Sequence, residues 1–154
     1  MWIVENIFMV KVKLFFETFT DSEMSDHAII RLKCGVQFRK KEGWTQPYSA
    51  IIDTGAHTSV IPLSLWRDLD YISKGKHKIF GLSKKEECSL IGELAEIALI
   101  FVDEEGTQTT ELNARAFLAD TDQIPIILGF QGILEQLRVT FDYTKSMAYV
   151  EDED

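Results

Sequence analysis

The 154-residue chain has only two cysteines, Cys34 and Cys88, and they lie far apart. Two cysteines are too few for a disulfide framework or a zinc cluster, so we expect reduced thiols that are buried or half-buried. The three histidines, His27, His57 and His77, lack metal-ligand spacing. We therefore expect no metal site and no cofactor.

Positive charge is also scarce, because 16 Lys and Arg residues stand against 25 Asp and Glu residues and give a net charge of −9. Phosphate backbones are bound by basic surfaces, so we expect no nucleic-acid partner. Charged residues interrupt the apolar N-terminus between Met1 and Phe19, and no apolar run reaches the length of a membrane span. We expect a cytoplasmic protein with no membrane partner.

The length and the balance of 45% hydrophobic to 27% charged residues predict one folded domain over residues 1–154. Short apolar or alternating segments separated by Gly, Pro and polar turns predict strands along most of it. In residues 27–38, Gly35 predicts a bulge or bend, and Gly92 predicts a bend before residues 93–102. Strands are also expected over 9–16, 74–82, 107–118, 138–143 and 147–151, with a charged, solvated tail over 151–154.

The stretch from Ser49 to Ile61 stands out, because small and β-branched residues lead into Asp53-Thr54-Gly55 and a second apolar segment follows. A carboxylate at the end of a core strand is costly unless it is hydrogen-bonded or paired. Such placement is typical of a functional acid, which is the interpretation we favour. The alternative is a turn aspartate that caps its own backbone. After Ile61, a short helical turn capped by Ser64 is expected.

A second fully apolar strand is predicted over residues 124–129. After it, Phe130, Ile133, Leu134 and Leu137 recur at the spacing of an amphipathic helix. We expect all four side chains to face the core.

The order of these features resembles the retropepsin family of aspartic proteases, the single-lobe relatives of pepsin. Asp53-Thr54-Gly55-Ala56 follows an apolar strand, a hairpin about Gly81 stands at the position of the family's flap, and Ile126-Ile127-Leu128-Gly129 precedes the helix. Residues 138–143 resemble cellular, non-viral members. The resemblance implies an all-β fold: a closed β-barrel or sandwich with a flap hairpin and one short C-terminal helix, preceded by an N-terminal β extension over residues 1–38.

The family's chemistry requires two aspartates that share one proton, so that one activates water while the other protonates the substrate. The chain has one Asp-Thr-Gly, which implies a homodimer with Asp53 of each copy as the catalytic pair. The resemblance implies that Thr54 and Gly55 support the loop that carries Asp53. It assigns contacts with a peptide or protein substrate to Ala56, His57, Gly81 and Leu82.

Retroviral members commonly carry an acid and an arginine where this chain has His57 and Phe130. Both halves of that ion pair are replaced together, which favours a cellular-type variant. The alternative is a catalytically silent module of the same fold that dimerises or binds peptides.

Overall fold

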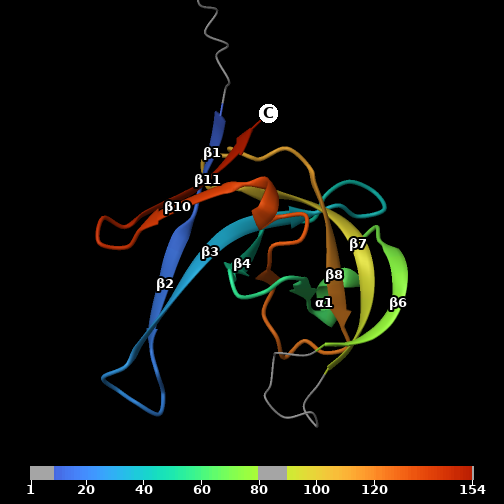
Figure 1. Cartoon of the computed structure of the whole chain (residues 1–154), viewed down its shortest axis with the longest axis horizontal. Coiled ribbons are helices and arrows are strands. Elements are labelled where there is room, and N and C mark those ends of the chain that lie inside the picture. The colour runs from blue at the N-terminus through green and yellow to red at the C-terminus, as the bar shows by residue number, and fades with distance from the viewer. Residues whose placement is uncertain (1–8, 80–89, 154) are drawn as a thin grey trace, which may run out of the picture.

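The computed structural model describes residues 9–79 and 90–153, and the regular secondary structure of these residues is almost entirely β-strand, as predicted (Figure 1). One sheet has three strands in the order β1-β11-β10, and the other has eight in the order β2-β3-β4-β9-β5-β8-β7-β6. The strands are β1 (Met9–Lys13), β2 (Phe15–Thr20), β3 (Ala28–Phe38), β4 (Tyr48–Ile52), β5 (Ser59–Ile61), β6 (Ile72–Ile79), β7 (Leu90–Val102), β8 (Leu112–Ala119), β9 (Ile127–Leu128), β10 (Arg138–Asp142) and β11 (Met147–Glu153).

Strand β3 closes the larger sheet into a barrel, because it pairs with β4 on one side and with β7 on the other. Gly35 lies opposite both Ser49 and Val102 without a shift of register, so a bulge at this position is wrong. A side chain here would place its Cβ 2.5 Å from the carbonyl oxygen of Val102, so the glycine is needed for the close approach of β7. Gly92 is likewise in register, opposite Ala119, within the continuous β7.

The barrel core is formed by side chains that alternate along the strands. On β3, Cys34, Val36 and Phe38 are fully buried, and they pack in one cluster with Leu99 and Phe101 of β7. Cys34 is a buried free thiol, as expected, and this burial raises the pKa of the thiol. Cys88 lies outside the described residues.

The short helix α1 (Leu63–Trp66) begins after Pro62 without a side-chain cap, so the predicted Ser64 cap is wrong. The backbone N–H of Ser64 instead donates a 2.6 Å hydrogen bond to Oδ1 of Asp122. None of the helices among residues 9–79 and 90–153 is long and apolar enough to cross a membrane.

The predicted C-terminal helix is only a 3-10 turn, η2 (Leu134–Gln136). Gly132 interrupts it, because its φ is +74° and a Cβ there would lie 2.2 Å from the carbonyl oxygen of Asn113. Ile133 and Leu134 are buried as expected. Phe130 is 41% exposed, so its predicted place in the core is wrong.

The predicted hairpin of β10 and β11 is confirmed, but its acidic end is not solvated. Glu151 and Asp152 lie in β11 between β1 and β10, and both are buried. Oδ2 of Asp152 accepts hydrogen bonds from the backbone N–H and the hydroxyl of Thr110, both at 2.6 Å. These two donors satisfy a carboxylate that the sequence alone assigned to solvent.

Strands β1 and β2 are separated only by Leu14, yet β1 pairs with β11 in the small sheet and β2 pairs with β3 in the large one. Before Lys33, β3 pairs in the described structure with β2 alone. The resulting two-stranded hairpin, residues 15–32, projects from the barrel, and we call it the arm (Figure 1).

Candidate active site

Asp53 is the first residue after β4, the strand that delivers it from the core. Ala50 and Ile52 of β4 are buried, whereas Thr54 and Gly55 immediately beyond Asp53 are exposed. The Asp53 side chain is half-buried, at the boundary between the barrel core and solvent. The carboxylate is therefore held by a rigid element while it remains accessible to a reactant.

One oxygen of this carboxylate is anchored within its own turn. The backbone N–H of Gly55 donates a 2.8 Å hydrogen bond to Oδ1 of Asp53, and the N–H of Ala56 donates to the Asp53 carbonyl at 3.2 Å. The turn-capping interpretation is thus correct as geometry. In the described part of the chain no group donates to Oδ2, which leaves that oxygen able to hold a water molecule or share a proton.

The second apolar strand, β9, supports the turn that contains Asp53. It runs parallel to β4 and antiparallel to β5, and thus lies between the two strands that enter and leave the Asp53 loop. The Asp53 N–H donates to the Leu128 carbonyl at 3.0 Å, and the Gly129 N–H donates to the buried hydroxyl of Ser59 at 2.9 Å. Both ends of the loop are therefore fixed to β9 and the residue after it.

The middle of the loop is fixed by the residues that follow Gly129. The N–H of Phe130 donates to the Ala56 carbonyl at 3.0 Å, and the N–H of Gln131 donates to the His57 carbonyl at 2.8 Å. A Cβ on Gly129 would lie 2.5 Å from the Ala56 carbonyl oxygen, so only glycine permits this approach. Two segments more than 70 positions apart thus form one rigid unit around the acid.

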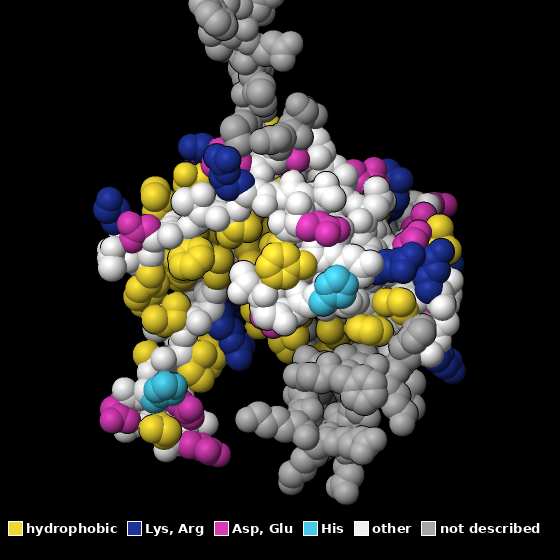
Figure 2. Space-filling model, in the orientation of Figure 1, with side chains coloured by type: hydrophobic (Ala, Val, Ile, Leu, Met, Phe, Trp, Pro, Cys, Tyr) yellow, Lys and Arg dark blue, Asp and Glu magenta, His cyan; other side chains and the backbone are white. Residues whose placement is uncertain are grey.

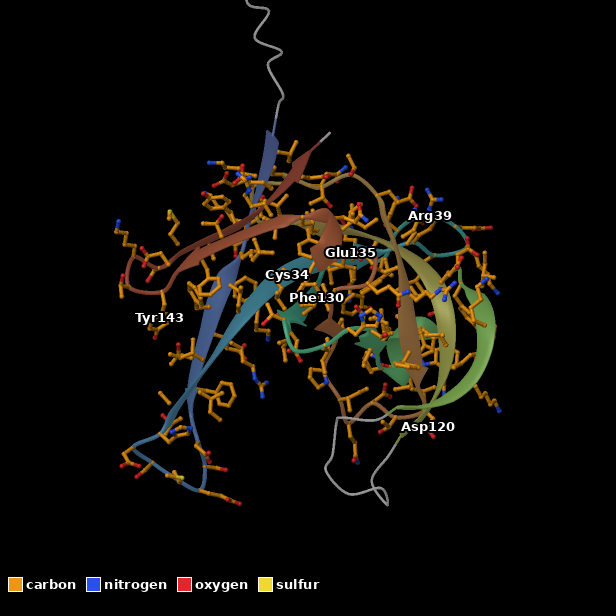
Figure 3. The ribbon with its side chains drawn as sticks, in the orientation of Figure 1. Cys34, Arg39, Asp120, Phe130, Glu135 and Tyr143 are labelled. Carbon is orange, nitrogen blue, oxygen red and sulfur yellow. The ribbon has the colours of Figure 1, made fainter. Side chains whose placement is uncertain are left out.

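His57 and Phe130 stand at the two positions where retroviral members commonly carry an acid and an arginine. The same backbone hydrogen bonds bring these two residues close together. The His57 side chain is exposed, and Phe130 is 41% exposed. Figure 3 shows Phe130 near Glu135, on the face where β9 leads into η2. Backbone hydrogen bonds hold the two segments together here, so the missing charges are not required for their contact.

No family model matches the chain, and no curated protein matches it. The chain is similar to a retropepsin-like aspartic protease of known structure from Rickettsia conorii. The two are 12% identical, the similarity covers 91% of this chain and 96% of that protein, and the TM-score is 0.46.

The predicted site residues fall into two groups. Asp53, Thr54, Gly55, Ala56 and His57 lie together in the loop between β4 and β5. Gly81 and Leu82 lie outside the described residues. What the structure describes of the expected flap is its base, where β6 and β7 pair antiparallel up to Ile79 opposite Leu90.

Ser59 and Gln131 were missed as members of this unit. Ser59 is a fully buried hydroxyl in a strand whose other residues, Val60 and Ile61, are apolar and buried. A lone serine in such a strand indicates a buried hydrogen bond, which was the available signal. Gln131 contributes only its backbone N–H, so its side chain carried none. Among residues 9–79 and 90–153, no cluster of three or more His, Cys, Asp or Glu is placed to hold a metal ion.

Proposed function

We propose that this protein is an aspartic endopeptidase, in which water activated by Asp53 hydrolyses peptide bonds at a site shared by two copies of the chain. One observation carries the proposal. The Asp53 carboxylate lies at the end of a buried strand, in a loop that residues 128–131 fix in place. Its Oδ1 accepts a hydrogen bond from the Gly55 N–H, and no group of the described residues donates to its Oδ2. A merely structural turn aspartate does not require such a frame.

The chemistry follows from two such carboxylates brought close together. Because two negative charges held this close together repel each other, the pair of carboxylates holds one proton over a wide pH range. The ionised aspartate takes a proton from a bound water as its oxygen attacks the peptide carbonyl carbon, and the protonated aspartate gives its proton to the carbonyl oxygen. Collapse of the tetrahedral intermediate then breaks the C–N bond, with proton transfer to the leaving amine.

The other loop residues support this reaction in the proposal. Gly55 fixes the carboxylate through its N–H, and Thr54, which is exposed, faces the second copy. Ala56 and His57 line the path of an extended peptide, which Gly81 and Leu82 cover from the flap side. The proposal includes no cofactor and places the protein in the cytoplasm.

The test is cleavage of a peptide library by the purified protein across pH, with Asp53→Asn as the decisive variant. We expect cleavage to be strongest at mildly acidic pH, where the pair holds one proton, and Asp53→Asn to abolish it with the fold intact. Asp68→Asn is the matched control. Asp68 is an exposed acid just after the end of α1, so this substitution should leave the rate of cleavage unchanged. Equal cleavage by Asp53→Asn and the parent would refute the mechanism.

The silent module makes a different prediction in the same assay. It would bind peptides tightly at acidic and neutral pH without turning them over. A peptide that is retained and recovered uncleaved by the parent protein would therefore contradict the proposed hydrolysis and support the binding function.

A further inference from the structure

The arm is placed by its register next to the candidate active site. Strands β3 and β4 pair from Val36 opposite Tyr48 to Lys33 opposite Ile51. Continued by two residues, this register places Arg31 level with Asp53, and residues 28–30, paired with residues 18–20 of β2, extend beyond it. The base of the arm therefore lies beside the end of β4, the strand from which the Asp53 loop leaves (Figure 1).

On one face of the arm, the apolar side chains that line the barrel core continue beyond the end of the barrel, where they are exposed to solvent. Side chains of a strand alternate between two faces, so Ile30 and Leu32 share the face of the buried Cys34. On β2, Phe16 lies opposite Leu32 and Thr18 opposite Ile30, and both are on this same face. Ile30 is 47% exposed, because the barrel ends before it.

The end of the β10–β11 hairpin adds aromatic rings to this face. Phe16 makes edge-on contacts with Tyr143 at 5.1 Å and with Phe141 at 6.4 Å between ring centroids. Phe141 is 61% exposed and Tyr143 is 46% exposed. We call Phe16, Ile30, Phe141 and Tyr143 the arm surface.

Figure 2 shows hydrophobic side chains gathered over the β2 and β10 side of the molecule, and Figure 3 shows Tyr143 at the end of β10, facing the arm. The charged side chains of the paired strands, Glu17, Arg31 and Lys33, alternate onto the opposite face of the arm. A two-stranded hairpin is at best marginally stable in water without a further layer against its apolar face. Exposed apolar patches with a polar surround are typical of protein interfaces.

We propose that the arm surface is covered by the same surface of a second copy of this chain, so that the two arms clasp the dimer on which the Asp53 site depends. The inference rests on the proposed function for its occupant, since only a second copy supplies the missing aspartate. A two-fold axis brings identical patches together, and an uncharged, aromatic patch can pack on itself without unpaired charges.

The size of a stable interface supports the same occupant. A stable dimer buries on the order of 800 Å² on each partner, which the few exposed residues of the Asp53 loop do not supply. The arm surface adds to this loop the side chains of Phe16 and Ile30 on the hairpin and of Phe141 and Tyr143 beside it. Large aromatic side chains are also the residues that contribute most binding energy at interfaces.

The test is sedimentation velocity of the full chain from micromolar to hundreds of micromolar concentration. We expect a dimer for the parent, and dimerisation weakened by at least about tenfold in Ile30→Glu and Phe141→Glu, because each buries a charge against an apolar partner. Ile72→Glu is the matched control, since Ile72 is an exposed isoleucine on β6, outside the arm surface, and should leave dimerisation unchanged. Circular dichroism and thermal unfolding confirm that each variant is folded.

Peptide cleavage measured on the same samples separates this inference from the proposed function. Arm variants that dimerise like the parent would overturn the clasp, even if the parent cleaves peptides. A parent that is monomeric throughout would also overturn it, and would leave the surface to another protein partner. A parent dimer that the arm variants dissociate, but that cleaves no peptide, would support the clasp and contradict the protease.

Discussion

The backbone N–H of Gly129 donates a 2.9 Å hydrogen bond to the hydroxyl of Ser59, and this hydroxyl is completely buried. The bond joins the strand that leaves the Asp53 loop to the residue that follows β9. It is one of few side-chain contacts in a frame otherwise built from backbone groups, so it can be removed by a single substitution.

Replacing Ser59 by alanine should lower the free energy of unfolding by about 1–3 kcal/mol, because the Gly129 N–H loses its acceptor in a site without solvent. Urea unfolding measures this change. Ser49→Ala is the control, since Ser49 is an exposed serine on β4 and should shift the free energy by less than about 0.5 kcal/mol. Equal effects of the two substitutions would show that the hydroxyl does not brace the loop.

Gly129→Ala should displace the Asp53 loop, because its Cβ would lie 2.5 Å from the Ala56 carbonyl oxygen. We expect a loss of about 1–3 kcal/mol of stability and of all peptide cleavage, measured on the same preparation. Gly43→Ala also adds a methyl group, at a φ of +80° but with no atom within 4 Å. It should cost stability through backbone strain while cleavage persists. Full activity of Gly129→Ala would contradict the close approach.

The free energy of unfolding should depend on pH through Asp142, in the turn between β10 and β11. The Thr144 hydroxyl, at 2.6 Å, and the Lys145 N–H lower the pKa of this carboxyl. Since the folded-state pKa lies below the unfolded value of about 3.9, the stabilisation is present above that pH and is lost as the pH falls through the folded-state pKa.

Stability curves of the parent and Asp142→Asn should therefore differ at neutral pH and converge in strong acid. An NMR titration of Asp142 gives the pKa directly, and Thr144→Val should move it back toward the ordinary aspartate value. An Asp142 pKa that does not respond to Thr144→Val would contradict the assigned cause.

Cys34 should be inert in the native protein, because burial in the barrel raises the pKa of its thiol and excludes reagents. Labelling with a thiol reagent on a Cys88→Ser background isolates this one residue. We expect no modification at neutral pH in buffer and complete modification in concentrated urea. Rapid native labelling would mean that the barrel opens at β3 far more often than its packing suggests.

The strand and turn around Asp53 could be predicted because each of its signals is local. A run of β-branched residues, an Asp-Thr-Gly turn and a second apolar run occupy one continuous stretch of sequence. The apolar strand before Gly129 was visible for the same reason. The pairing of β9 between β4 and β5 depends on the tertiary fold, and no local signal in the sequence predicts it.

The failures have the opposite origin, since each depends on a distant neighbour. The helix expected after Phe130 is shortened because Gly132 packs against the backbone at Asn113. The acidic end of β11 is buried because Thr110 supplies two donors to Asp152. Helical spacing and charge are properties of a segment alone, and neither contains information about these contacts.

The frame of the Asp53 loop also sets when the site can form during synthesis. Asp53 leaves the ribosome long before residues 128–131, which supply its backbone partners, and barrel closure waits for β7 to reach β3. Closing such long loops is entropically costly and slow. A nascent or truncated chain that ends before β9 therefore carries Asp53 without the backbone partners that hold its loop in place.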